Sequence, residues 1–436
     1  MTTAIDPSAP ASQEATVRQS RVARRTAVYL TLATVSLINL ISYAPLDVRA
    51  HEKAWGDALN YYAMSEHTGA QVDNPFALRM LSPWLVHLAG KVTGLPLDVL
   101  WLGFTAAVTL ACTVVFFEFC WRHLNLQLFT SAVAAIALGC TFWYGPYAFS
   151  NPFLVDPLNN LLYLVALWLV FKRKLVLFTV VIVVGAINKE TTLLLAPLYP
   201  LLAWTRARSL RDRQVLFGVL AVVAASVAYV GFRMWAQHLI GSTYSFGSGQ
   251  GNHSLASNIV FALSSNKRGE HAALFDTFHF FWLVSGYGLY LQYRQKGPRS
   301  PLFVSSIYLA LCCLAGRMVA TDTQRVFVML APLVIGVVAV TLDSQRSDIR
   351  RLLVVLLAFL YLALNLQLVP NDMKFLAEVG GLVLFAALVS PQTWLSRGRR
   401  SAAPADPRTE DFPPRRGTLS LSEEPTTRRP ASETRP

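Results

Sequence analysis

Long apolar segments alternate with short clusters of Lys and Arg along almost the whole of this 436-residue chain. Hydrophobic residues make up 54% of the sequence and charged residues only 14%, which is unlike the composition of a soluble domain. Many of the segments approach the roughly 20 residues that a helix needs to cross about 30 Å of hydrocarbon. The pattern predicts an all-α fold, a polytopic transmembrane helical bundle.

About twelve membrane segments are expected, and together they form one transmembrane helical domain over residues 27–395. Residues 1–26 and 396–436 are polar and have little apolar surface to bury, so both tails are predicted to be disordered. The expected segments lie near residues 27–45, 97–117, 126–144, 157–171, 175–188, 191–204, 214–232, 273–292, 301–319, 326–342, 352–369 and 379–395.

Lys and Arg gather in the short links between segments and set the expected orientation, because cytoplasmic loops are rich in both. The net charge of +13 is therefore attributed to membrane topology, and no nucleic-acid partner is expected. With a cytoplasmic N-terminus, every basic cluster faces the cytoplasm, provided that residues 79–95 do not cross. The predicted protein is multi-pass in a bacterial cell membrane, with both termini cytoplasmic and long extracytoplasmic loops at 46–96 and 233–272.

Two stretches do not fit ordinary crossings. Residues 79–95 are short, contain charged residues and a proline, and are expected to form an interfacial or re-entrant helix. The paired segments 175–188 and 191–204 are short for two full crossings, so a hairpin that enters the membrane only part way is an alternative.

The first extracytoplasmic loop holds an acidic residue in a sequence typical of an interfacial helix. As a helix, residues 54–64 place Trp55, Leu59 and Tyr62 on one face and Asp57 and Tyr61 towards the other. This arrangement would keep the Asp57 carboxylate at the membrane surface, just after the first segment. The alternative is that Asp57 only solvates the polar face of the helix.

Two further residues of the outer face have both a functional and a structural interpretation. Arg79 precedes Pro83 by about one turn, and its guanidinium could clamp a phosphate or anchor the chain at the interface beside Trp84. Asp156 precedes Pro157, a pair that fits a helix N-cap with proline at the first helical position. Asparagines one turn further along that helix favour a polar cavity beneath Asp156.

Charged residues also occur at the apex of the short hairpin and at the start of the tenth segment. Lys189 and Glu190 are adjacent at the apex and are either functional or simply neutralise each other. Asp322 opens the tenth segment at a capping position, and Arg325 follows one turn later. Histidines on the outer face lack the spacing of metal ligands, so no metal site is predicted.

The layout resembles the GT-C superfamily of polytopic glycosyltransferases, which take a sugar from a polyprenyl-phosphate lipid at the non-cytoplasmic face. The resemblance covers residues 27–395 loosely and is carried mainly by Gly56-Asp57, which lies where that superfamily has its first-loop catalytic acid. It implies that Asp57 is catalytic and acts as a base. The implied substrate-binding residues are Arg79, Asp156, Lys189, Glu190, Asp322 and Arg325.

The resemblance also implies the partners: a polyprenyl-phosphate lipid donor, a glycan or lipid acceptor, and the surrounding membrane lipids. The first loop has no D-x-D or D-E pair, because Glu52 and Asp57 are separated. A divalent cation is therefore left open as a cofactor, and no cofactor is firmly predicted. Two other functions stay open, a secondary transporter of a polar solute and a noncatalytic membrane scaffold.

Overall fold

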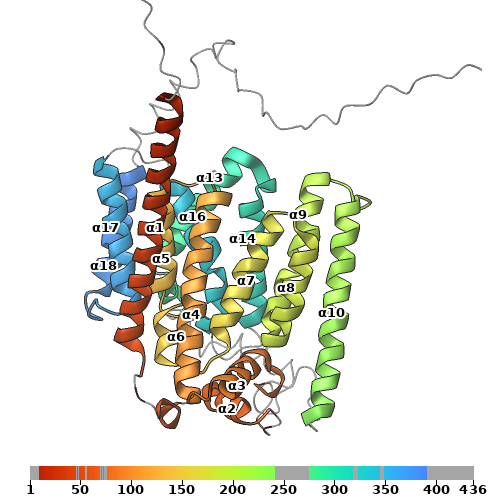
Figure 1. Cartoon of the computed structure of the whole chain (residues 1–436). Helices are drawn as coiled ribbons and strands as arrows, with labels where there is room; N and C mark the ends of the chain where they lie inside the picture. The colour runs from red at the N-terminus through yellow and green to blue at the C-terminus, as the bar shows by residue number, and fades with distance from the viewer. Residues whose placement is uncertain are drawn as a thin grey trace, which may run out of the picture. The chain divides into compact units, whose positions relative to one another are not determined.

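The computed structural model describes residues 9–45, 47, 49–54, 56–68, 70, 72, 76–240, 274–317, 323–343 and 348–389. Over these ranges every regular element is a helix, which confirms the all-α prediction (Figure 1). The chain divides into two units, Met1–Leu388 and Val389–Pro436, and the description below concerns the first. The tail predicted at 396–436 lies outside the described residues.

The N-terminal half of the chain supplies most of the helices that surround the site described below. They are α1 (Ala9–Tyr43), α2 (Asp57–Glu66), α3 (Leu81–Thr93), α4 (Leu97–Glu118), α5 (Leu128–Cys140), α6 (Pro146–Ser150), α7 (Asp156–Phe171), α8 (Leu175–Asn188), α9 (Leu198–Ala207) and α10 (Arg213–Ile240). Short 3-10 helices precede α2 and α3 and lie between α8 and α9, at Ala50–Lys53, Phe76–Leu78 and Glu190–Leu195.

The C-terminal half adds a second group of helices. They are α13 (Phe281–Lys296), α14 (Pro301–Arg317), α15 (Thr323–Phe327), α16 (Ala331–Leu342), α17 (Asp348–Asn365) and α18 (Lys374–Val389). The most extensive packing between the halves joins α16 to α5, and α14 also packs against α9. The central helix α16 is buried along most of its length.

Four helices within the described residues are long and apolar enough to cross a membrane: Val22–Tyr43, Leu97–His123, Arg213–Leu239 and Gln324–Leu342. A fifth crossing is obtained if Phe281–Arg299 and Pro301–Arg317, which meet at an angle of 106°, form one bent span. Several other expected segments form apolar helices of 10–17 residues, among them α5, α7 and α8, and the last two have the expected limits within one residue. A 14-residue helix such as α8 measures only about 21 Å, less than the hydrocarbon thickness of a bilayer.

Two helices extend into stretches that the sequence predicts to be disordered or looped. The first helix begins at Ala9, so the prediction of a disordered tail at 1–26 is wrong for residues 9–26. Pro10 fits the start of a helix, and no Gly or Pro follows it until Pro45. Likewise α10 continues to Ile240, so the part of the expected loop before that residue is helical.

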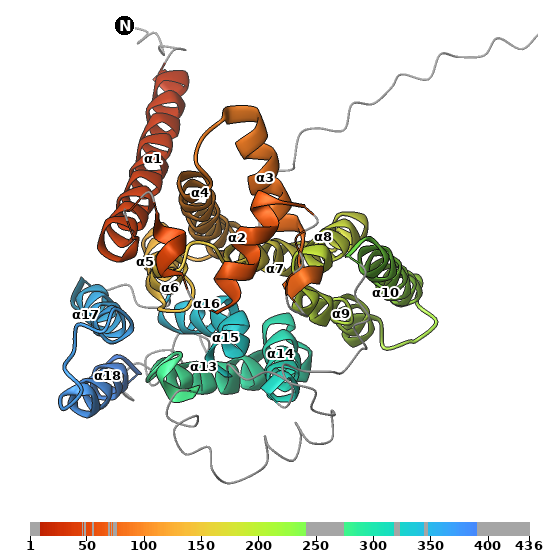
Figure 2. The same ribbon diagram turned by 90° about the horizontal axis from the view of Figure 1, so that it is seen from below.

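The first loop folds across one end of the bundle. Figures 1 and 2 show α2 and α3 lying across the ends of the longer helices. The 13 residues of α3 reach only about 20 Å, which agrees with the expectation that residues 79–95 do not cross. A shared apolar core that includes Tyr61, Phe76, Trp101 and Phe153 packs this loop against α4 and the start of α7.

Polar contacts to α4 fix the orientation of α2 within that core. Tyr62 donates its hydroxyl to Asp98 Oδ2 at 2.9 Å, and His51 Nδ1 lies 2.9 Å from Asp98 Oδ1. On the next turn of α2, the Ser65 hydroxyl accepts a hydrogen bond from Trp101 Nε1 at 3.0 Å. These contacts hold the N-terminus of α2, where Asp57 lies, in a fixed place.

The antiparallel helices α7 and α8 carry the chain to one end of the bundle and back. α7 starts at Asp156, α8 ends at Asn188, and Asn188 Nδ2 donates to the Val155 carbonyl at 2.9 Å. Ser82 of α3 donates to Asn188 Oδ1 at 2.6 Å, so the link between α8 and α9, which is the apex of the hairpin expected at 175–204, is tied to the first loop as well. Gly185 lets the chain fold back closely, because a Cβ there would lie 2.5 Å from Thr192 Cγ2.

Candidate functional site

Arg325 of α15 joins two acids that come from distant parts of the chain. Its Nη1 donates to Asp57 Oδ2 at 2.9 Å, and its Nη2 donates to Asp156 Oδ2 at 2.7 Å. The second oxygen of Asp156 accepts a hydrogen bond from Lys189 Nζ at 2.6 Å. The first loop, the start of α7, the hairpin apex and α15 therefore meet through an unbroken series of charged contacts.

A second pair lies beside this series. Arg79 donates two parallel hydrogen bonds to Glu190, from Nε to Oε2 at 3.1 Å and from Nη2 to Oε1 at 2.5 Å. Its third nitrogen, Nη1, donates to the Tyr61 hydroxyl at 3.0 Å, and the guanidinium lies 5.7 Å from the centre of the Phe76 ring. This two-pronged geometry is the one that arginine offers to carboxylates and phosphates alike.

The two groups together form what we call the ion cluster. It contains three acids and three bases, so its formal charges cancel. Five of the six side chains are between 11% and 19% exposed, and Glu190 is 34% exposed. The ion cluster consists of Asp57, Arg79, Asp156, Lys189, Glu190 and Arg325.

Six of the seven residues that the sequence selects are thus brought together from five segments. The seventh, Asp322, lies outside the described residues. The interpretation that Lys189 and Glu190 neutralise each other is wrong, because they pair with Asp156 and Arg79 respectively. The capping interpretation of Asp156 also fails, since the N-cap of α7 is Val155 and the Asp156 carboxylate accepts hydrogen bonds from Lys189 and Arg325.

Local backbone structure places two of the acids at helix N-termini. Asp57 is the first residue of α2 and Asp156 is the first residue of α7, where the helix dipole favours negative charge. Gly56 enters α2 with a φ of +62°, a conformation that L-residues rarely adopt. The Gly56-Asp57 pair therefore has a structural reason: glycine makes the turn that presents the carboxylate to the ion cluster.

Burial and charge oppose each other at the Arg79–Glu190 pair. Burial alone would raise the pKa of Glu190 and lower that of Arg79. The charge and hydrogen bonds of Arg79 outweigh burial and lower the pKa of Glu190 from 4.5 to about 2. Glu190 in turn raises the pKa of Arg79, whereas burial prevails at Lys189 and lowers its pKa despite the nearby Asp156.

No family model and no curated protein matches this chain. The ion cluster itself is therefore the basis for assigning a function. Among the residues that the structure describes, no three His, Cys, Asp or Glu side chains gather where they could hold one metal ion. We accordingly name no metal ligands.

Two aspects of the site were not anticipated from the sequence. One is that Tyr61 contacts Arg79 directly. Tyr61 lies four residues after Asp57 on the same helix face, and this spacing is the sequence signal that could have identified it. Tyr62 is expected on the same face of α2 as Leu59, but unlike Leu59 it is buried, because its ring stacks on His51 and its hydroxyl reaches Asp98. Leu59 is exposed, as expected for that face.

The pKa of Glu190 predicts a dependence of stability on pH. Because this pKa is lower in the folded protein, the Arg79–Glu190 pair stabilises the fold fully above pH 4.5 and loses that effect as the pH falls towards 2. We expect the melting temperature of the detergent-solubilised protein to fall more steeply across this range in the wild type than in Glu190→Gln. Equal slopes, measured by tryptophan fluorescence, would contradict the assigned pair.

Proposed function

We propose that this protein is an integral membrane glycosyltransferase that moves a sugar from a polyprenyl-phosphate donor to an acceptor at the extracytoplasmic membrane face. The observation that carries the proposal is the direct contact of Arg325 with both Asp57 and Asp156. It places a carboxylate that can accept a proton beside cations that can bind a phosphate. The resemblance of the sequence layout to the GT-C superfamily supports the same reaction.

Asp57 is the catalytic base in this proposal. Its carboxylate takes the proton of the acceptor hydroxyl while the hydroxyl oxygen attacks the anomeric carbon of the donor sugar. The bond between that carbon and the donor phosphate oxygen breaks, and polyprenyl phosphate leaves with the bonding electrons. One attack of this kind inverts the configuration of the anomeric carbon.

The three cations of the ion cluster bind the leaving phosphate. Arg79, Lys189 and Arg325 come from three different segments and converge on one region, as phosphate binding by several donors requires. In the structure their donors are engaged by carboxylates. The donor phosphate therefore enters by replacing a carboxylate. When the phosphate takes the place of Asp57 on Arg325, the Asp57 carboxylate is released and can act as the base.

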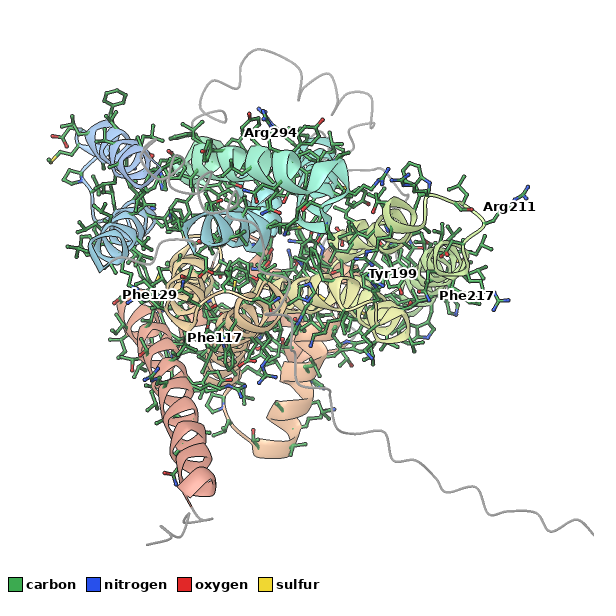
Figure 3. All side chains as sticks on the ribbon, turned by 90° about the horizontal axis from the view of Figure 1, so that it is seen from above. Phe117, Phe129, Tyr199, Arg211, Phe217 and Arg294 are labelled. Carbon is green, nitrogen blue, oxygen red and sulfur yellow. The ribbon has the colours of Figure 1, made fainter. Side chains whose placement is uncertain are left out.

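The proposal includes the finer topology expected from the sequence. About twelve membrane segments, some of them short, place the ion cluster on the extracytoplasmic face, and the basic links and both termini in the cytoplasm of a bacterial cell. The grouping of the links α7–α8, α9–α10 and α13–α14 at the end of the bundle opposite α2 and α3 supports this arrangement (Figures 1 and 3). A site at that depth meets a lipid-linked sugar whose isoprenoid tail stays in the bilayer.

A secondary transporter of a polar solute is the second candidate. The complete pairing of the charges in the ion cluster favours it, because such pairs can open and close a pathway as a solute passes. A cavity of about 240 Å³ at the other end of α7 lies away from the ion cluster and supports neither candidate over the other. A noncatalytic scaffold would need the charges only for packing, and it would leave the convergence of three cations on one region without a use.

A panel of polyprenyl-phosphate sugars tests the proposal. The purified full-length protein is supplied with each donor in detergent and with a mixture of glycan and lipid acceptors, and the release of polyprenyl phosphate is followed. We expect one donor to give turnover that is inhibited by added polyprenyl phosphate, because this product occupies the same cations. Absence of turnover with every donor, in protein that binds none of them, would contradict the proposal.

A further inference from the structure

A cavity with polar side chains in its lining lies at the opposite end of α7 from the ion cluster. It has a volume of about 240 Å³ and is formed where the α7–α8 link meets α9 and the start of α10. The 16 residues of α7 separate it from Asp156 by about 24 Å, so it is a separate site. The polar side chains that line it are Arg173, Tyr199, Arg206, Asp212 and Gln214.

Two arginines give this cavity a positive charge. In the part of the chain that the structure describes, neither Arg173 nor Arg206 has an ion pair or hydrogen bond through its guanidinium. Burial and the charge of Arg173 lower the pKa of Arg206, which shows that the two cations lie close together. The lining also holds one carboxylate, Asp212, so two guanidinium groups face a single negative charge and the cavity keeps one net positive charge that an anion would offset.

The remaining polar groups of the cavity are engaged in ways that leave donors available. The Tyr199 hydroxyl donates to Gln214 Oε1 at 3.0 Å. This contact uses the oxygen of the Gln214 amide, so the amide N–H groups can donate to a ligand. Asp212, the one acid in the lining, accepts the Gln214 backbone N–H at 2.8 Å and so caps α10. The cavity is therefore lined by two guanidinium groups, an amide and a carboxylate that is already engaged.

Exposed apolar side chains border the cavity on the same helices. Trp204 of α9 is 46% exposed, and Leu216 and Phe217 of α10 are 50% and 53% exposed. Figure 3 shows Tyr199 and Phe217 near each other on these two helices, with Arg211 at the periphery. A polar, cationic hollow beside an apolar helix face is the pattern expected for a lipid headgroup whose acyl chains lie along the protein.

We propose that this cavity binds a phosphate group held by Arg173 and Arg206, supplied by the headgroup of an anionic phospholipid. The same chemistry would accept the phosphate of a soluble compound, and the experiment separates the two sources. The site is independent of the proposed glycosyl transfer, since it lies at the other end of the bundle.

Binding is measured on the full-length protein by native mass spectrometry from micelles of phosphatidylcholine with or without phosphatidylglycerol. The test variant is Arg173→Gln with Arg206→Gln. The matched control is Arg208→Gln with Arg211→Gln, which removes the same charge from arginines that do not line the cavity. We expect the test variant to bind phosphatidylglycerol about tenfold more weakly and the control to bind within about twofold of the wild type.

Inorganic phosphate identifies the source of the ligand. Failure of millimolar inorganic phosphate to displace phosphatidylglycerol assigns the cavity to a lipid, and displacement assigns it to a soluble phosphate. Unchanged binding by the test variant, or equal losses in both double variants, would overturn the proposal. Arg173→Lys with Arg206→Lys keeps the charge and must retain binding, so a loss caused only by misfolding of the glutamine variant is recognised.

Discussion

Asp57→Asn lowers the rate of sugar transfer at least about 100-fold, because the amide cannot accept the proton of the acceptor hydroxyl. The substitution keeps the size of the side chain and an oxygen that can accept the hydrogen bond from Arg325 Nη1. Donor binding should therefore change little while turnover falls. The measurement is the release of polyprenyl phosphate at saturating donor, together with the donor concentration that gives half of the maximal rate.

Glu52→Gln is the matched control for this variant. Glu52 lies in the same loop, and its side chain is 57% exposed and outside the ion cluster. We expect its activity to match that of the wild type. An Asp57→Asn protein that turns over as fast as the wild type would remove Asp57 from the role of base.

Arg325→Ala has a large expected effect on both activity and stability. Loss of one cation that stabilises the leaving phosphate lowers turnover by about 100-fold to 1000-fold. The same substitution leaves Asp57 and one oxygen of Asp156 unpaired where the side chains are only 19% and 16% exposed. A largely buried carboxylate that has lost its ion-pair partner lowers the free energy of unfolding by about 3 kcal/mol. Thermal unfolding and transfer rates measured on the same preparation test both effects.

Arg325→Lys separates the two roles of this residue. An ammonium keeps the positive charge but cannot reach two acids with separate nitrogens as the guanidinium does. We expect most of the stability to return while turnover stays at least about tenfold below that of the wild type. If lysine restored turnover fully, the bridging geometry would have no part in the reaction.

The sequence predicts the helical class because apolar length and composition are local properties. An 18-residue stretch within Arg213–Leu239, for example, has a mean hydropathy of 2.4, which leaves little alternative to a long apolar helix. Helix limits are less predictable, because the polar residues after Ala9 have adequate helix propensity even though they bury little. The limits of α7 and α8 agree within one residue with the expected segments 157–171 and 175–188. The close packing of Gly185 against Thr192 after the end of α8 is a tertiary contact that the pattern of apolar residues does not predict.

The members of the ion cluster are predictable to the extent that membrane proteins place few charges in apolar surroundings without a reason. The sequence selects Asp57, Arg79 and Arg325 by their expected place on the outer face, in or beside an interfacial helix or at the start of a membrane segment. Their pairing was not predictable, since Lys189 and Glu190 are adjacent and each has its partner in another segment. Contacts that span 268 residues, as between Asp57 and Arg325, are fixed by the packing of whole helices.

The most direct measurement of the central claim follows a donor that carries one isotope in its phosphate and another in its sugar. The full-length protein is reconstituted in sealed vesicles with this donor and an acceptor. Our account predicts that the labels separate, with the phosphate label recovered as polyprenyl phosphate and the sugar label on the acceptor, and that Asp57→Asn prevents the separation. Labels that stay together while the donor or a solute crosses the bilayer would contradict the account and identify a transporter.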